Sequence, residues 1–263
     1  MLNLRRLFAR ADTHTPSTDF RKKIPVPAWG FTDESVVDEH FVPVSDMTFE
    51  AYLDRNDLTA IHHLVRYRWA AAVLRSGAPP ARVLDLGSGD GYGTHEIARA
   101  LPASSVTGVD YDRDAVEEAA RKYFAPNLEF RCANPMDWRR SIGAEAWDAI
   151  VCFEVLEHLP HRELLLEGVV DSLGKEGVLL FSTPSANLEN VLRPEWEPHK
   201  VEYCPASLFD FLRRYFGVVL GQDMEGFPSD EVFLPLVSRR VDYPPIMNPV
   251  FCREPIRIQS PYK

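Results

Sequence analysis

Residues Val83–Gly93 read VLDLGSGDGYG, and this stretch decides which fold we predict. A short apolar run predicts a strand at Arg82–Leu86, four glycines then alternate with other residues, and the next segment predicts a helix at Thr94–Leu101. Glycine lets a backbone turn tightly and lets a ligand approach it closely. In open α/β sheets, ligands lie beyond the carboxyl ends of the strands. The stretch therefore predicts an α/β fold with a ligand site at this loop.

Strand and helix patterns alternate on both sides of the loop. Apolar residues at helical spacing predict an upstream helix over Phe49–Arg75, which Gly77, Pro79 and Pro80 end. Strands are predicted at Arg82–Leu86, Ser105–Val109, Leu128–Cys132, Trp147–Phe153, Gly177–Ser182, Gly217–Gln222 and Pro249–Arg253. Further helices are predicted at Asp114–Tyr123, Arg162–Leu173 and Ala206–Tyr215. Repeated βα units imply a seven-stranded, mostly parallel, Rossmann-like sheet with helices on both faces.

Charge and cysteine content narrow the classes of function. A net charge of −10 argues against nucleic acid as a partner, because broad nucleic-acid binding draws on many Lys and Arg contacts to phosphates. We find no apolar run long enough to cross a bilayer. Four cysteines without paired spacing predict a reducing compartment, and hence the cytoplasm. The sequence leaves open whether the protein forms a homo-oligomer.

The second predicted strand leads into Asp110, roughly twenty residues beyond the glycine loop. A carboxylate there can accept hydrogen bonds from both ribose hydroxyls of a nucleoside. A dinucleotide fingerprint needs G-x-G-x-x-G/A, but its third glycine position holds Tyr92 when counted from Gly87, and Thr94 when counted from Gly89. The spacing therefore disfavours NAD, and a glycine-rich turn without a ligand stays open as an alternative.

The observed D-x-G-x-G-x-G pattern resembles motif I of class I S-adenosylmethionine (SAM)-dependent methyltransferases, and the resemblance covers most of Arg82–Asp223. It implies that SAM is the cofactor. An Asp at position 85 suits the ammonium group of SAM, and Asp110 resembles the family's ribose-binding acid. Asn134 stands where the family usually has an Asp that contacts the adenine amino group; an ordinary Asx turn is the alternative.

Upstream of motif I, the run HHLVRYR resembles a helix in which an Arg-Tyr pair lies near the methionine carboxylate of SAM. The resemblance thus points to Arg66, and a solvated basic helix face is the alternative. In total it implies a cofactor site made of Arg66, Asp85, Gly87, Ser88, Gly89, Asp110, Tyr111, Asn134, Pro135, Met136, Phe153 and Glu154.

The run EVLEH follows the fourth predicted strand. If it is helical, Glu154, Glu157 and His158 share one face, and two carboxylates with an imidazole suit a divalent cation. His199 is a candidate fourth ligand. The run resembles one in ubiquinone-pathway O-methyltransferases and, together with HKVEY at 199–203, one in small-RNA 3′-terminal 2′-O-methyltransferases, which implies Mg²⁺ or Mn²⁺. In the metal-free alternative, Glu154 lines the SAM site and His158 or His199 is the general base.

A wider resemblance, to small-molecule and polysaccharide-associated O-methyltransferases, covers Thr183–Asn187, His199–Tyr203 and the helix Ala206–Tyr215. It implies O-methylation of a sugar or other small metabolite, with residues 192–198 and Tyr203 in the acceptor wall. The alternatives are metal-dependent RNA 2′-O-methylation, methylation of nitrogen or carbon, and a non-catalytic SAM-binding regulatory protein.

The chain of 263 residues is expected to form one catalytic domain with two additions. Residues 1–48 are predicted to be an N-terminal arm or lid. Residues 49–227 are predicted to be the methyltransferase domain with its preceding helix. The proline-rich residues 228–263 are predicted to complete the sheet and the acceptor site.

Overall fold

The computed structural model describes residues 43, 51, 54–55, 58–143, 146–184, 190–192, 198–222, 228–229 and 249–257. The predicted N-terminal arm, apart from Pro43, and most of residues 228–263 therefore lie outside the described residues. Of the predicted acceptor wall, residues 193–197 also lie outside.

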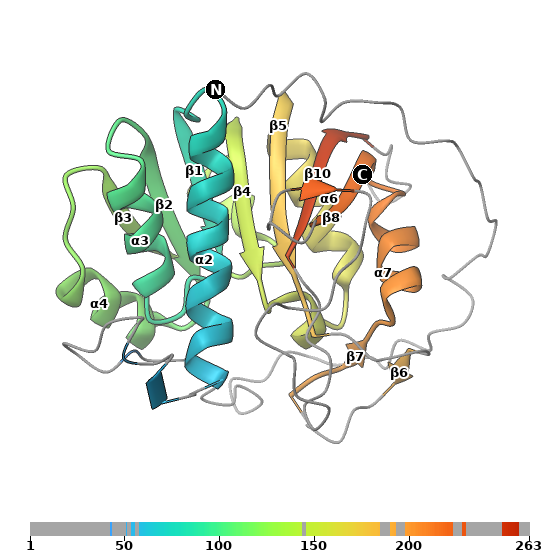
Figure 1. The fold of residues 1–263 in the computed structure, drawn as a ribbon, viewed down its shortest axis with the longest axis horizontal. Helices are drawn as coiled ribbons and strands as arrows, with labels where there is room; N and C mark the ends of the chain where they lie inside the picture. Colours follow the sequence, from blue (N-terminus) through green and yellow to red (C-terminus); the bar gives the residue numbers. More distant parts are fainter. Residues whose placement is uncertain are drawn as a thin grey trace.

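An eight-stranded sheet forms the centre of the described protein (Figure 1), with the order β3-β2-β1-β4-β5-β10-β8-β9. Its strands are β1 (Arg82–Leu86), β2 (Ser105–Asp110), β3 (Leu128–Cys132), β4 (Trp147–Phe153), β5 (Leu173–Ser182), β8 (Phe216–Gln222), β9 (Pro228–Ser229) and β10 (Val250–Pro255). Strands β1 to β5 pair in parallel, whereas β10 is antiparallel to β5 and β8. The predicted sheet is confirmed, and the two-residue β9 adds an eighth strand at its edge.

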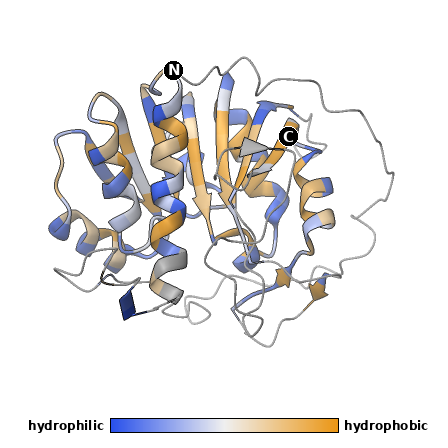
Figure 2. Ribbon diagram, viewed as in Figure 1, coloured by the Kyte–Doolittle hydropathy of each residue, from blue (hydrophilic) through white to orange (hydrophobic). Residues whose placement is uncertain are grey.

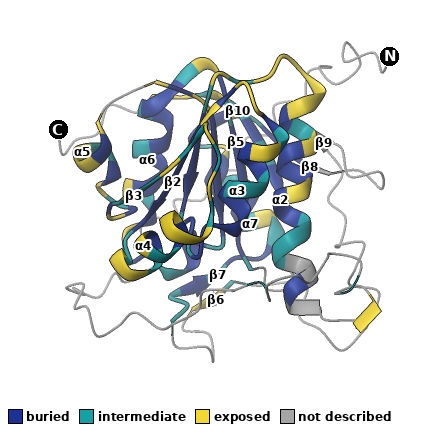
Figure 3. Ribbon diagram, turned by 90° about the vertical axis from the view of Figure 1, so that its left-hand side faces the viewer, coloured by how far each residue is buried: buried dark blue, intermediate teal, exposed yellow. Residues whose placement is uncertain are grey.

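Alternating side chains along the strands divide the core between the two faces of the sheet. One cluster packs residues of α2 (Leu58–Ser76) and α3 (Tyr92–Ala100) against Val83, Val106, Ala149, Val151 and Leu180. The other packs α5 (Trp138–Ile142), α6 (Arg162–Ser172) and α7 (Pro205–Leu212) against Leu84, Leu86, Ile150, Cys152, Leu179, Phe181 and Cys252. The central strands are accordingly apolar (Figure 2) and buried (Figure 3), as expected when helices cover both faces.

Local sequence explains where the helices begin and end. The side chain of Asp112 accepts hydrogen bonds from the backbone N–H groups of Asp114 and Ala115, and so caps α4 (Arg113–Lys122). Helix α7 starts with Pro205, whose fixed φ suits a first helical turn. Helix α2 ends at Ser76, just before Gly77, Pro79 and Pro80, as predicted. No helix among the described residues is long and apolar enough to cross a membrane.

The strand order places a topological switch at β1. From β1 the chain continues to β2 and β3 on one side, and then returns to β4 on the other side. A ligand site is expected at this point, beyond the carboxyl ends of the strands. The residues that follow or end these strands are Gly87 after β1, Asp110 in β2, Glu154 after β4 and Ser182 in β5. These four positions define the edge at which the site is built.

Candidate active site

The glycine-rich loop after β1 has the backbone conformation that its sequence predicts. Gly87, Gly89 and Gly91 have φ angles of 80°, 49° and 83°, in the left-handed region that favours glycine. A Cβ on Gly87 would lie 2.2 Å from Cγ2 of Val155. The loop therefore packs directly against the segment after β4, and a side chain at position 87 would separate the two.

Asp110 holds this loop in place. Its Oδ2 accepts a hydrogen bond from the N–H of Gly89 at 2.8 Å, and its Oδ1 accepts one from the N–H of Asp112 at 3.0 Å. A carboxylate oxygen can accept more than one hydrogen bond, so these two contacts are compatible with the predicted binding of ribose hydroxyls. The buried Oγ of Ser88 has no hydrogen-bond partner among the described residues. This unpaired polar atom in a partly buried loop fits the predicted SAM site, and Tyr111 follows Asp110 directly.

Asp85 lies beneath the loop and is fully buried. Thr94 donates its hydroxyl to Oδ2 at 2.6 Å, and Tyr67 donates its hydroxyl to Oδ1 at 3.3 Å. Burial raises the pKa of Asp85 to about 7, although the two hydrogen bonds oppose this shift. The ring of Tyr67 also packs edge-on against Phe153, with centroids 5.2 Å apart. The structure thus gives Asp85 two partners inside the protein, and its predicted contact with the ammonium of SAM stays a prediction.

The predicted adenine side of the site follows β3. Asn134 is exposed, and its side-chain oxygen accepts a hydrogen bond from the N–H of Met136 at 2.8 Å. This is the Asx turn that the sequence offered as the alternative role. The same oxygen has a second lone pair, so a contact with an adenine amino group remains available to it. Pro135 is buried and Met136 is partly buried, beside these exposed atoms.

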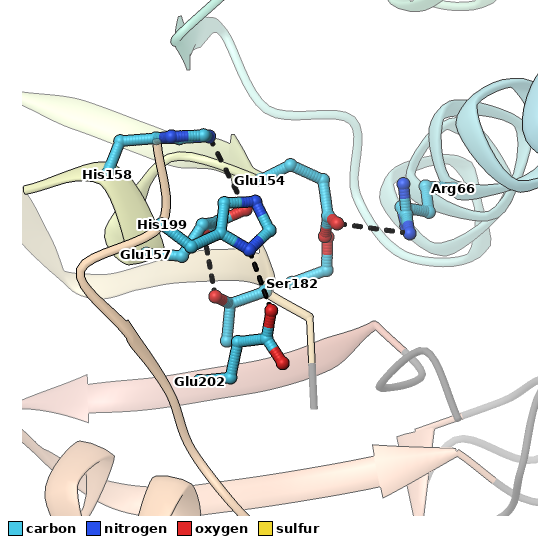
Figure 4. Close-up of polar contacts among 8 residues, drawn as sticks. Arg66, Glu154, Glu157, His158, Ser182, His199 and Glu202 are labelled. Carbon is cyan, nitrogen blue, oxygen red and sulfur yellow. Dashed lines mark hydrogen bonds and ion pairs between the residues drawn. The ribbon is translucent and has the colours of Figure 1, made fainter. Parts of the chain in front are cut away.

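Glu154 stands at a sharp change of backbone direction, and this corrects one expectation. Its φ is 56°, and the single 3₁₀ turn η4 (Leu156–His158) begins only after it. Glu154, Glu157 and His158 therefore do not share a helical face. Instead, Glu154 forms an ion pair with Arg66 at 3.3 Å, and Ser182 donates its hydroxyl to Oε1 of Glu154 at 2.7 Å (Figure 4).

Three of the four predicted metal ligands do come together. Glu157, His158 and His199 each offer a ligand atom, and these atoms lie within 4.8 Å of one another. Nε2 of His158 is 3.8 Å from Oε1 of Glu157, and the two histidine rings lie 5.0 Å apart in a T-shaped arrangement. We call Glu157, His158 and His199 the acidic–histidine cluster. Its members come from the turn after β4 and from the segment before β7 (Val201–Glu202).

Glu157 is the most deeply buried member of the cluster. Only 1% of its side chain is exposed, and burial followed by the charge of Glu154 raises its pKa well above the usual range. Thr183 donates to its Oε2 at 2.7 Å, whereas its Oε1 has no hydrogen-bond partner among the described residues. An unpaired, buried carboxylate oxygen beside two imidazoles fits a divalent cation in both donor type and position.

Some residues that support the site were not singled out from the sequence. Thr183 holds Glu157, Ser182 holds Glu154, and Oε1 of Glu202 lies 2.8 Å from Nδ1 of His199. Thr94 likewise holds Asp85, and so does Tyr67, which the sequence had indicated only as the tyrosine of an Arg-Tyr pair near the methionine carboxylate. For Glu202, the signal was its position three residues after His199 in HKVEY. The other contacts join separate elements, so no local sequence pattern predicts them.

A family model for the methyltransferase domain matches residues 61–213, which is more than half of the chain. This chain belongs to the methyltransferase domain family. The match confirms the predicted class I SAM-dependent methyltransferase family and the enzyme class that it implies. Motif I, Asp110 and the acidic–histidine cluster all lie within the matched residues.

Curated relatives of this methyltransferase domain include O-methyltransferases. A malonyl-[acyl-carrier protein] O-methyltransferase of Bacillus cereus is 30% identical over 102 residues, or 39% of this chain and 37% of that protein. A ubiquinone biosynthesis O-methyltransferase of Actinobacillus pleuropneumoniae is 33% identical over 114 residues, or 41% of this chain and 47% of that protein. The chain thus matches less than half of the length of either relative.

Solved methyltransferase structures share the fold. The plantazolicin methyltransferase BpumL, solved with S-adenosylhomocysteine (SAH) and a monoazolic desmethylPZN analogue, has a TM-score of 0.52 and 14% identity, over 78% of this chain and 89% of that one. The N-terminal domain of EvdMO1, solved in the presence of SAH and D-fucose, has a TM-score of 0.51 and 19% identity, over 72% of this chain and 82% of that one. At these identities, the likeness supports the Rossmann-like methyltransferase fold.

Proposed function

We propose that this protein transfers the methyl group of SAM to an oxygen atom of a small-molecule acceptor, such as a sugar or another small metabolite. The observation that carries the proposal is the position of the acidic–histidine cluster. The turn that bears Glu157 and His158 packs on the glycine loop through Val155, which would lie 2.2 Å from a Cβ on Gly87. Groups that can activate a hydroxyl therefore adjoin the proposed SAM site.

The proposed SAM site uses the residues predicted from motif I. Asp110 takes the ribose hydroxyls, while the backbone of Gly87–Gly89 and the hydroxyl of Ser88 face the amino-acid part of SAM. Asn134, Pro135 and Met136 take the adenine, with Tyr111 and Phe153 beside them. Arg66 stays the proposed partner of the methionine carboxylate. Arg66 now forms an ion pair with Glu154. The methionine carboxylate of SAM would either join this ion pair or take the place of Glu154 in it.

The chemistry requires little covalent work from the protein. A lone pair of the acceptor oxygen attacks the sulfonium methyl, the C–O bond forms as the C–S bond breaks, and the electron pair stays on sulfur as SAH leaves. His158 or His199 accepts the hydroxyl proton, because a neutral imidazole has a nitrogen lone pair that can act as a general base. Holding the two reactants in line contributes much of the rate enhancement.

We propose Glu157, His158 and His199 as the residues that would hold Mg²⁺ or Mn²⁺, with Glu154 as a fourth predicted ligand. A bound cation would lower the pKa of an acceptor hydroxyl. The protein itself orients the cluster through Thr183 and excludes water from Glu157 by burial. Since Glu154 now contacts Arg66 and Ser182, it would have to leave these partners to serve as a ligand.

The names of relatives, a solved neighbour and the charge of the chain all bear on the choice of acceptor. The names of two curated relatives describe O-methylation of malonyl-[acyl-carrier protein] and O-methylation in ubiquinone biosynthesis, and the EvdMO1 domain was solved in the presence of D-fucose. A net charge of −10 disfavours long RNA, although the cluster would also suit the two hydroxyls of an RNA 3′ end. A sugar or comparable hydroxyl compound is therefore the acceptor that we favour.

The test is transfer of radiolabelled methyl from SAM to a panel of sugars, nucleotide sugars, catechols and short single-stranded RNAs. Wild-type protein and His199→Ala are compared with Mg²⁺ and with chelator, and SAH affinity is measured by calorimetry for both. We expect labelling of a small hydroxyl compound, lost in the variant while SAH still binds. Labelling of RNA alone would establish the RNA alternative. Tight SAH binding without any transfer would favour a non-catalytic SAM-binding protein.

A further inference from the structure

His199 lies between two carboxylates. On one side of the ring, Nδ1 is 2.8 Å from Oε1 of Glu202. On the other side lie Glu157 and His158, whose ring is 5.0 Å from that of His199 (Figure 4). The position of His199 therefore depends on a residue outside the acidic–histidine cluster.

The chemistry of this pair fixes where the proton resides. An ionised carboxylate is an acceptor only, so a hydrogen bond to Glu202 requires the proton on Nδ1 of neutral His199. Nε2 then carries the lone pair. In metal sites and in catalytic histidines, a carboxylate on the far nitrogen selects the tautomer and the ring orientation in this way.

The backbone around the pair is tied down on both sides. The N–H of Lys200 donates to the carbonyl of Glu157 at 2.6 Å, which joins this segment to η4. Beyond it, β7 pairs with β6 (Val191–Leu192) in antiparallel register, with Val191 opposite Glu202. Because both His199 and Glu202 lie on this tied segment, their contact follows from the fold rather than from two free side chains.

We propose that Glu202 is a positioning residue, which holds the proton of His199 on Nδ1 and directs the Nε2 lone pair toward Glu157 and His158. In the proposed function that lone pair either binds a cation or, where His199 is the base, accepts the acceptor's proton. The use of the lone pair rests on the proposed function. The tautomer itself depends only on the contact between His199 and Glu202.

The first measurement reads the tautomer directly, in wild-type protein without metal. Long-range ¹H–¹⁵N spectra of ¹⁵N-histidine-labelled protein, with His199→Gln to assign the signal, distinguish a protonated Nδ1 from a protonated Nε2. We expect the proton on Nδ1 in the wild type, and on Nε2 or exchanging between both nitrogens in Glu202→Ala. A wild-type His199 with its proton on Nε2, or an unchanged tautomer in Glu202→Ala, would overturn the proposal.

The second measurement is calorimetric titration of Mn²⁺ into protein saturated with SAH. Loss of a residue that orients a metal ligand typically costs about 10–100-fold in affinity, and we expect this loss for Glu202→Ala. Glu202→Gln keeps an acceptor oxygen and should recover most of it, whereas the exposed Glu176→Ala removes the same charge elsewhere and should leave the affinity unchanged. If wild-type protein binds no metal, the metal form of the proposed function fails, and the tautomer measurement still decides the role of Glu202.

Discussion

Replacing Asp85 by Asn tests whether the carboxyl under the glycine loop is protonated in the folded protein. Asp85 is fully buried, and burial raises its pKa from an ordinary 3.8 to about 7. Asn has the shape of the neutral acid and keeps one acceptor oxygen. A hydroxyl that faces its NH₂ group can rotate to accept, so Thr94 and Tyr67 can keep hydrogen bonds to it.

The sign and size of the effect follow from proton linkage. Between pH 3.8 and about 7, the unfolded chain is ionised at position 85 while the folded protein holds a proton, so the free energy of unfolding falls as the pH rises. Each unit of pKa difference corresponds to about 1.4 kcal/mol, which makes the full loss about 4 kcal/mol. The loss is complete above about pH 7, where both states are ionised. Asp85→Asn has no ionisable group at this position, so its free energy of unfolding does not undergo this fall as the pH rises.

The assay is urea unfolding of both proteins without cofactor, from about pH 4 to about pH 8. All other titrating groups, including Glu157, are common to the two proteins, so their effects cancel in the difference between the free energies of unfolding. We expect the variant to gain about 4 kcal/mol relative to the wild type across this range. If the free energies of unfolding of the two proteins instead changed in parallel with pH, Asp85 would be ionised in the folded protein, and the argument from burial would be refuted.

Four further substitutions separate the parts of the site. Gly87→Ala should reduce SAH affinity more than tenfold by calorimetry, because the new Cβ would meet Val155 at 2.2 Å and the φ of 80° is strained for alanine. Asp110→Ala should weaken SAH binding by roughly 1–3 kcal/mol, and unchanged affinity would refute our placement of the ribose. Glu157→Gln should abolish Mn²⁺ binding and methyl transfer in the radiolabel assay while SAH affinity stays within about twofold. Arg66→Ala should weaken SAH but not 5′-methylthioadenosine, which lacks the amino-acid part, in paired titrations; equal losses would place Arg66 elsewhere.

The strands of the sheet were predictable because most of their residues are buried and apolar. The predicted bounds of β1, β3 and β4 agree with the structure to the residue. Strand β5 begins at Leu173, four residues before the predicted start, because the exposed Lys175 and Glu176 interrupt its apolar run. Helix α5 was missed, since its five residues are too short to show helical periodicity.

The site was predictable where one local pattern carries it. Alternating glycines predicted the loop, and the spacing to Asp110 predicted a carboxylate for the ribose; the structure shows that this carboxylate also accepts from the loop at Gly89, while its contact with a ribose stays a prediction. The partners of Asp85 could not be found in this way, because Tyr67 and Thr94 reach it from α2 and α3 after those helices have packed. Nothing local predicts a non-glycine residue with positive φ, and this conformation of Glu154 is what broke the expected helical face.

That conformation has a consequence for how the site is divided. A left-handed backbone at a residue other than glycine costs about 1–3 kcal/mol, so surrounding contacts must hold it in place. At Glu154 they do: its N–H donates to the carbonyl of Ser182 at 3.0 Å, its carboxylate accepts the hydroxyl of the same serine, and Arg66 pairs with it. A regular helix would instead have stacked Glu154 on Glu157, two carboxylates on one face. The turn separates the two carboxylates. Glu154 contacts Arg66 of α2, whereas Glu157 lies beside His158 and His199. Burial, and after it the charge of Glu154, still raises the pKa of Glu157, so the two sides of the site remain electrostatically linked although they no longer share a helical face.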